Sequence, residues 1–190
     1  MFFYQPALFA GIVFMAAGLL PFSKKKRLYY GALFLLTLML SFWGELKWEN
    51  VTLFPAALLL LIGTAIPVKG HWERVLLSGL FGGVAAWKLT DWVPLFFEPA
   101  LPGGLALILF VWLYCKGAEE RFCACALGGI TYELSFCLQE YFLFSYCRVR
   151  LGSPNGVSIS AMGLCFILAI HLCPQLSQTK KPQLREISPA

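Results

Sequence analysis

Seven apolar stretches, separated by short charged hinges, occupy nearly all of this 190-residue chain. A helix needs about 20 predominantly apolar residues to cross a bilayer. The stretches are residues 2–22, 28–43, 51–68, 75–97, 101–114, 122–146 and 157–173. They predict an all-α fold, a polytopic transmembrane bundle of about seven helices with no strand. Six spans are possible, because the short stretch 101–114 could form a hairpin with 75–97 that does not fully cross.

The composition excludes an ordinary water-soluble domain. Hydrophobic residues make up 59% of the chain and charged residues 13%, and the mean hydropathy is +0.72. Soluble domains carry about 25% charged residues, so too few charges are present to cover a water-facing surface. We expect one transmembrane domain over residues 1–174 and a polar cytoplasmic tail without regular structure over residues 175–190.

Lys and Arg are concentrated in alternate hinges. Eleven of the 15 lie after the first, third, fifth and seventh stretches, at residues 24–27, 69, 74, 116, 121, 180, 181 and 185. Only Lys47, Arg148 and Arg150 lie in the other hinges. Cytoplasmic loops are enriched in Lys and Arg, so we expect the N-terminus outside and the C-terminus inside a cell membrane. The first stretch precedes its cations, unlike a signal peptide, and is expected to be a retained helix.

Small residues predict which helices pack together. Gly79 and Gly83 form a GxxxG pair in the fourth stretch, while Gly128 and Gly129 complete small-xxx-small pairs in the sixth. Such residues let helix backbones approach closely in lipid. We expect the fourth and sixth helices to pack within one chain. The alternative is an interface with another membrane protein or with a second copy in a homodimer.

Several polar residues interrupt the apolar stretches, where each charge costs about 2.5–3.5 kcal/mol. They are Lys88 and Asp91 in the fourth stretch, and Glu133, Gln139 and Glu140 in the sixth. Lys88 and Glu133 are expected at similar depth, which predicts an ion pair between the two helices. Lys88 could also pair with Asp91, three residues away on the same helix.

These residues allow two interpretations. They could form a polar pocket or pathway that opens outward, used for a substrate, a lipid headgroup or protons. They could instead form an internal polar knot that fixes helix register. Beyond them, Arg148 and Arg150 begin a basic outer turn through Gly156, with glycine and proline in it. This turn could bind lipid phosphates, neutralise Glu140 or simply be solvated.

No catalytic or metal-binding motif is found. Hydrolysis requires a nucleophile with a base or a metal with several ligands, and the chain has only two histidines. Cys123-Ala-Cys125 lacks the spacing and the nearby histidines of a zinc site. The cations flank apolar runs, so the net charge of +5 does not indicate a nucleic-acid partner. We expect no enzyme activity, no metal and no cofactor; the lipid bilayer is the expected partner.

Three short segments resemble the YphA-like membrane proteins of endospore-forming bacteria: Phe97-Glu98-Pro99, Gly129-Ile-Thr-Tyr-Glu133 and Leu151-Gly152-Ser153. The resemblance implies a bacterial plasma membrane and no defined activity. The expected function is therefore a non-enzymatic binding or interaction component of that membrane, which could be sporulation-associated. The alternative is a small transporter or substrate-binding subunit that uses Lys88, Glu133 and Glu140, although no internal repeat favours transport.

Overall fold

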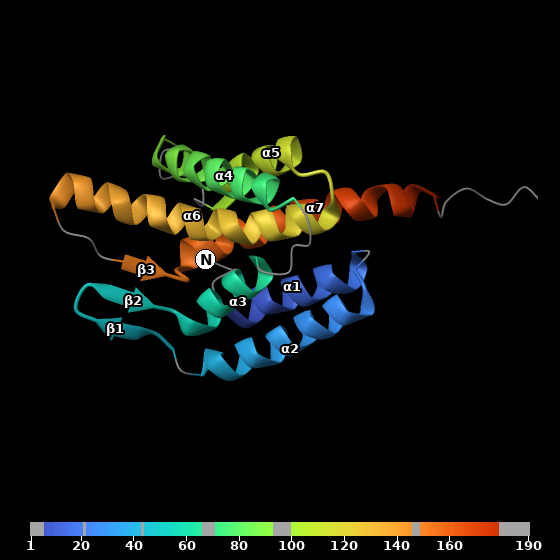
Figure 1. Ribbon diagram of the computed structural model, residues 1–190, viewed down its shortest axis with the longest axis horizontal. Helices are drawn as coiled ribbons and strands as arrows, with labels where there is room; N and C mark the ends of the chain where they lie inside the picture. The colour runs from blue at the N-terminus through green and yellow to red at the C-terminus, as the bar shows by residue number, and fades with distance from the viewer. Residues whose placement is uncertain are drawn as a thin grey trace, which may run out of the picture.

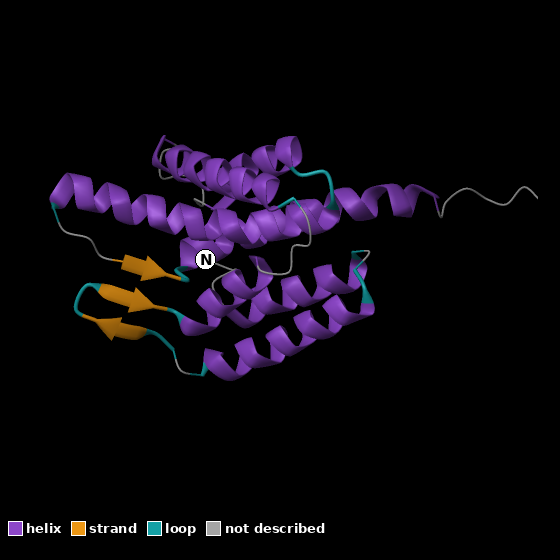
Figure 2. Ribbon diagram, viewed as in Figure 1, coloured by secondary structure: helices purple, strands orange, loops and turns teal. Residues whose placement is uncertain are grey.

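The computed structural model describes residues 6–20, 22–42, 44–65, 71–92, 100–145 and 149–178. Seven helices and a three-stranded sheet are found there (Figures 1 and 2). The helices are α1 (Pro6–Leu19), α2 (Lys24–Ser41), α3 (Pro55–Ala65), α4 (Trp72–Trp92), α5 (Ala100–Tyr114), α6 (Ala118–Phe144) and α7 (Pro154–Gln178). The strands are β1 (Leu46–Trp48), β2 (Val51–Leu53) and β3 (Val149–Leu151).

The helical prediction is confirmed, with different boundaries. Helix α2 starts inside the basic hinge because the Ser23 hydroxyl accepts a hydrogen bond from the Lys26 N–H at 3.4 Å, which caps the helix. Helix α7 continues to Gln178, past the expected domain boundary at residue 174. The ends of several predicted stretches, at residues 2–5, 66–68 and 93–97, lie outside the described residues.

The expectation that the chain contains no strand is wrong. Strands β1 and β2 form an antiparallel hairpin, and β2 also pairs in parallel with β3, with Val51 opposite Val149. The predicted stretch 51–68 therefore begins as a strand, and helix α3 starts at Pro55, where the missing N–H of proline costs little. Strands of three residues are too short to give a clear alternating pattern.

Helices α6 and α7 lie between the α4–α5 pair and the group α1, α2 and α3 (Figure 1). The α4–α6 packing predicted from small residues is confirmed within the chain. A methyl group on Gly83 would lie 2.6 Å from the Gly128 oxygen, and one on Gly79 would lie 2.7 Å from the Leu127 side chain. Gly129 instead faces α7, where a methyl group would lie 2.7 Å from the Gly156 oxygen.

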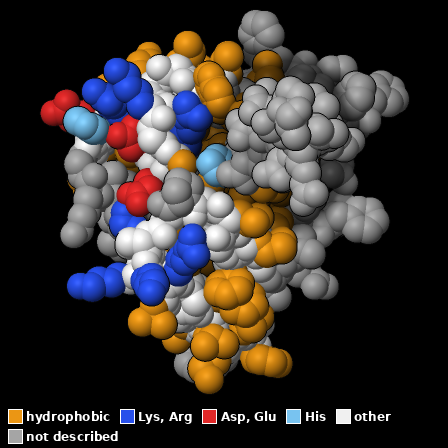
Figure 3. Space-filling view, turned by 90° about the vertical axis from the view of Figure 1, so that its right-hand side faces the viewer, with side chains coloured by type: hydrophobic (Ala, Val, Ile, Leu, Met, Phe, Trp, Pro, Cys, Tyr) orange, Lys and Arg blue, Asp and Glu red, His pale blue; other side chains and the backbone are white. Residues whose placement is uncertain are grey.

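The described residues of the hinges lie at two opposite ends of the bundle. At one, which we call the basic end, Lys26 forms an ion pair with Glu119, and the Cys115 thiol lies 3.9 Å from the Arg74 carbonyl. The described cations of this end are Lys24, Lys25, Lys26, Arg27, Arg74, Lys116 and Arg121. Figure 3 looks onto it and shows Lys and Arg side chains gathered there. The other, the sheet end, carries β1, β2 and β3.

Among the described residues, two helices are long and apolar enough to cross a membrane. They are α6 and the part of α7 from Pro154 to Leu172. Three further apolar helical stretches, Phe9–Leu19, Pro55–Ala65 and Leu101–Tyr114, are shorter. Core helices of soluble proteins can have the same length and apolar composition as these two helices.

Candidate functional site

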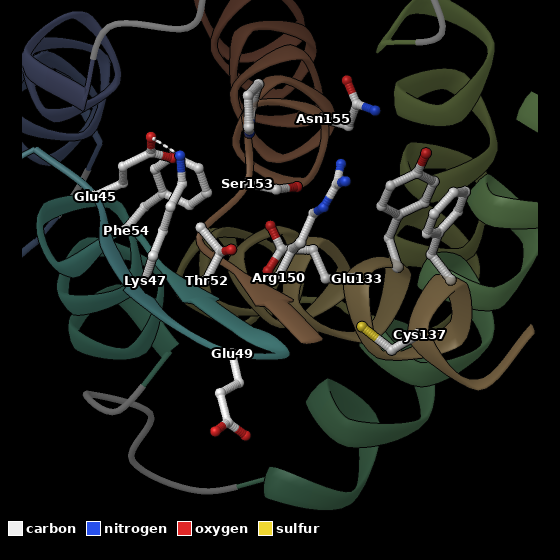
Figure 4. Close-up of a pocket in the computed structure, with 13 residues that line it drawn as sticks. Glu45, Lys47, Glu49, Thr52, Phe54, Glu133, Cys137, Arg150, Ser153 and Asn155 are labelled. Carbon is white, nitrogen blue, oxygen red and sulfur yellow. Dashed lines mark ion pairs between the residues drawn. The ribbon is translucent and has the colours of Figure 1, made fainter. Parts of the chain in front are cut away.

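A cavity of about 650 Å³ lies at the sheet end, between the sheet and the adjoining parts of α6 and α7 (Figure 4). Sites for small molecules typically measure about 300–1,000 Å³. Charged, polar and aromatic side chains share its wall. The lining residues are Glu45, Lys47, Glu49, Thr52, Phe54, Tyr132, Glu133, Phe136, Cys137, Arg150, Ser153, Pro154 and Asn155. The cavity can therefore offer a ligand both charge and apolar surface.

The turn from β3 into α7 shapes one side of this cavity. Gly152 has a φ of +78°, a left-handed conformation that suits glycine. It also lies so close to the connection between β2 and α3 that a methyl group there would be 2.8 Å from the Phe54 oxygen. Ser153 then caps α7, because its carbonyl accepts from the Val157 N–H at 3.1 Å, and Pro154 is the first helical residue.

Glu133 of α6 is fixed against this turn. Its side chain is buried, with the residue 3% exposed, and its Oε2 accepts a hydrogen bond from the Gly152 N–H at 2.8 Å. The carboxyl group also faces the first turn of α7, where a methyl group on Gly156 would lie 2.7 Å from Glu133 Cδ. The positive end of a helix dipole favours an anion at this position.

The second carboxyl oxygen of Glu133 lacks a hydrogen bond. Within the described part of the chain, Glu133 Oε1 has no hydrogen-bond partner, although it is buried. A buried acceptor without a donor costs about 1–3 kcal/mol. Glu133 is also one of the residues that line the cavity, so a small rotation of its carboxyl group would let a ligand donate to Oε1 and remove this cost.

The predicted Lys88–Glu133 ion pair is wrong. Lys88 is exposed near the end of α4, and its ammonium group lies 4.1 Å from the centre of the Trp87 ring. Lys88 thus forms a cation–π contact with Trp87 in place of the predicted ion pair with Glu133. Helix α4 ends at Trp92, so Lys88 lies close to the sheet end rather than deep in the bundle, and its long side chain can reach outward. No pairing of Lys88 with Asp91 is formed within the described residues either.

Other polar side chains of α4 and α6 are linked by hydrogen bonds that do not involve Glu133. The Trp87 indole N–H donates to Gln139 Oε1 at 2.7 Å, and Gln139 Nε2 donates to Asp91 Oδ2 at 3.1 Å. These bonds join the two helices near the sheet end. Glu140 is half-buried and is not among the residues that line the cavity. Asp91, Gln139 and Glu140 are thus not brought together with Glu133 in one site.

Of the predicted basic turn, Arg148 lies outside the described residues, while Arg150 is exposed on β3 and lines the cavity. Figure 4 shows Arg150 in the middle of the view, among the side chains that line the cavity. The other cation of the wall, Lys47, forms an ion pair of 2.5 Å with Glu45. Arg150 forms no ion pair with a described residue, so its guanidinium is available to an anionic group.

The hinge residues Glu45, Lys47 and Glu49 are not recognisable as site residues from the sequence. Nothing local indicates that the strands of this hinge pair with the distant β3. The aromatic residues Phe54 and Phe136 were also missed, since apolar stretches contain many such residues. The signal that could have found the site is the turn at Gly152, whose glycine and proline spacing indicates a constrained backbone.

Within the described residues, no group of three or more His, Cys, Asp or Glu side chains lies close enough together to hold a metal ion. Comparison with known proteins gives no further assignment: no family model, no curated protein and no solved structure matches the chain.

Proposed function

We propose that this protein is a polytopic membrane protein that binds a small amphiphilic molecule in the sheet-end cavity. The observation that carries the proposal is the buried carboxylate of Glu133, which lines the cavity and has one oxygen without a partner. A buried polar atom without a hydrogen-bond partner is costly. A ligand that donates a hydrogen bond to this oxygen of Glu133 would remove the cost.

The surface of the bundle supports a lipid environment. Large apolar side chains are exposed on all seven helices, and soluble proteins rarely expose such continuous apolar surface. They include Phe14, Met15, Leu35, Leu36, Met39, Ile62, Leu80, Phe81, Val84, Leu105, Leu109, Trp112, Leu134, Phe142 and Ile170. Hydroxyl groups lie inside instead: those of Thr37 and Thr64 are buried and donate to carbonyls of their own helices. Apolar groups outside and satisfied polar groups inside suit a bilayer.

The same surface supports a multi-pass arrangement. The five helices that are shorter or more charged than α6 and α7 pack against these two or against each other, and they also expose apolar faces. The concentration of cations at the basic end supports a cytoplasmic basic end and an outer sheet end. A bacterial plasma membrane, and a role in sporulation, follow from the YphA-like resemblance alone and belong to this proposal.

The position of the cavity relative to α6 favours an amphiphile over a purely water-soluble ligand. The end of α6 projects beyond the strands (Figure 1). Its last turns expose Leu138, Tyr141, Phe142, Leu143 and Phe144. Because these side chains need an apolar environment, the sheet and its cavity lie at the level where headgroups meet acyl chains. A ligand at that depth combines a polar group with an apolar tail.

A transporter using Lys88, Glu133 and Glu140 has less support. Lys88 stacks on Trp87, Glu133 contacts the turn before α7, and Glu140 does not line the cavity. No described contact joins the three side chains into one pathway. Binding without transport remains the simpler function for a cavity at one end of the bundle.

Native mass spectrometry of the detergent-purified protein tests the proposal. The wild type is compared with Glu133→Gln and with Glu140→Gln, a matched control on the same helix outside the cavity. We expect wild type and control to carry a bound small molecule or lipid that Glu133→Gln retains at less than about a tenth of the level, which corresponds to about 1.4 kcal/mol. Equal occupancy in all three folded proteins, or none, would contradict the proposal. Membrane extraction with carbonate gives the second readout, since a peripheral protein would be released.

A further inference from the structure

We infer that the ligand is a phospholipid whose headgroup carries a primary ammonium beside its phosphate, as in an ethanolamine phospholipid. The inference rests on the proposed function, because it names the class of amphiphile that the same cavity binds. It is argued from one open acceptor, one available cation and the aromatic wall between α6 and the sheet.

The open acceptor specifies a donor with positive charge. Glu133 is one of the residues that line the cavity, and its buried Oε1, which faces the first turn of α7, has no hydrogen-bond partner in the described chain. The other oxygen is occupied by the Gly152 N–H. A primary ammonium supplies N–H donors and the charge that a carboxylate favours, and such charge-assisted bonds are the strong ones. A quaternary ammonium has no N–H, and a glycerol hydroxyl has no charge.

Aromatic side chains line the same cavity as Glu133. Tyr132 and Phe136 of α6 flank the position of Glu133 along the cavity wall, and Phe54 lines the wall from the loop after β2. Ring faces attract ammonium groups within about 6 Å. A carboxylate together with aromatic rings therefore forms a cation site, and Glu49 adds a further negative charge to the lining.

Arg150 supplies the complementary anion site. It lies on β3, two residues before Gly152, so its backbone is roughly 6.6 Å along the strand from the residue that holds Glu133. Lys47 is already paired with Glu45, which leaves Arg150 as the available cation among the described lining residues. The planar guanidinium suits phosphate oxygens. An ammonium and a phosphate joined by a short carbon spacer match these two neighbouring sites.

The acyl chains have a path beside the headgroup. Leu138, Tyr141 and Phe142 follow Glu133 along α6 and are exposed. Helix α6 carries both Glu133, which would bind the ammonium group, and these exposed apolar side chains. The tail of a lipid bound at Glu133 can therefore extend along the outside of the bundle. Free phosphoethanolamine would use the polar sites alone and leave this face unused.

The test measures binding of short-chain phospholipids to the purified protein, with headgroups that differ only in nitrogen methylation: ethanolamine, monomethyl-, dimethyl- and trimethyl-ethanolamine. A glycerol headgroup and free phosphoethanolamine complete the set. We expect affinity to fall with each methyl group, by at least tenfold over the series, and free phosphoethanolamine to bind at least tenfold more weakly than its lipid. Equal binding across the methylation series would overturn the assignment of a primary ammonium. Equal binding by free phosphoethanolamine would overturn the assignment of a lipid.

Variants locate the effect and separate the two proposals. Glu133→Gln should remove the preference for ethanolamine, Arg150→Gln should weaken all phosphate-bearing headgroups alike, and Glu140→Gln should change neither. The methylation series on the wild type keeps the inference testable if Glu133→Gln fails to fold. Saturable binding that depends on the cavity but ignores methylation would sink the inference and leave the proposed function standing. Folded wild type that binds none of the lipids would overturn the inference, and it would remove both proposals if native mass spectrometry also found no bound small molecule.

Discussion

The two ends of this bundle differ in how their charged groups are paired and in the size of their cavities. At the basic end, Lys26 is paired with Glu119. The Arg121 guanidinium lies 3.8 Å from the centre of the Trp112 ring, and its Nε donates to the Cys115 carbonyl at 3.1 Å. The hollow beside these groups is only about 210 Å³.

The core near the basic end is equally closed. The rings of Phe22, Tyr30 and Phe122 pack with centroids 5.2–5.5 Å apart, which adds edge-to-face contacts to the buried apolar surface. The sheet end, by contrast, contains the cavity of about 650 Å³, the open oxygen of Glu133 and an Arg150 without an ion pair to a described residue. Under the proposed function, the basic end serves packing and orientation, and the sheet end serves binding.

The largest effect should come from the turn that holds Glu133. In Gly152→Ala the left-handed φ of +78° adds strain of about 1–2 kcal/mol, and the new methyl group would lie 2.8 Å from the Phe54 oxygen. With overpacking of about 1–3 kcal/mol, we expect a loss near 3 kcal/mol in the free energy of unfolding. Gly44→Ala is the matched control: it also has a positive φ, +67°, but open space around it, so its cost should stay near 1 kcal/mol. Equal losses in denaturant titrations would show that the turn is not tightly packed.

A smaller effect is expected from the middle of the bundle, which both ends share. Gly83→Ala places a methyl group 2.6 Å from the Gly128 oxygen and should cost about 1–3 kcal/mol. Gly11→Ala in the middle of α1 meets nothing within 4 Å and should stabilise its helix by about 0.5–1 kcal/mol. Thermal unfolding of both variants in one detergent measures the difference; a neutral Gly83→Ala would mean that α4 and α6 are farther apart than described.

Two substitutions of Glu133 distinguish its contribution to stability from its contribution to ligand binding. Glu133→Ala removes the acceptor of the buried Gly152 N–H and should cost about 1–3 kcal/mol. Glu133→Gln keeps an amide oxygen for that N–H, so it should lose less stability than Glu133→Ala while losing the ligand. Unfolding midpoints, taken together with ligand occupancy, test this order. If Glu133→Gln were as unstable as Glu133→Ala, the carboxylate would be a structural group first.

The smallest effect is expected at the basic end. Glu119→Gln breaks the ion pair with Lys26, whose two side chains are 37% and 18% exposed. Pairs that solvent reaches contribute about 0–1 kcal/mol, so the unfolding midpoint should shift little and ligand occupancy should not change. A loss of ligand in Glu119→Gln would contradict the division of roles between the two ends.

The comparison also explains what could be predicted from the sequence. The helices, and the meeting of alternate hinges at one end, follow from apolar length and from the placement of cations, which are local properties. The costly position of Glu133 could be recognised for the same reason. Its partner could not, because a hydrogen bond to the Gly152 backbone depends on how β3 pairs with β2. Depth along ideal helices predicts an ion pair between Lys88 and Glu133. The rotation of α4 about its axis instead leaves the Lys88 side chain exposed on the outside of the bundle.

Photocrosslinking tests the central claim most directly. An ethanolamine phospholipid that carries a diazirine in its acyl chain near the headgroup is bound to the purified protein, irradiated, and the labelled peptides are identified by mass spectrometry. We predict labelling of residues 132–144 of α6 and of the segment 149–155, reduced in Glu133→Gln and unchanged in Glu140→Gln. Labelling concentrated around Trp112, Arg121 and Ile170 at the basic end, or spread evenly over all exposed helices, would contradict the account.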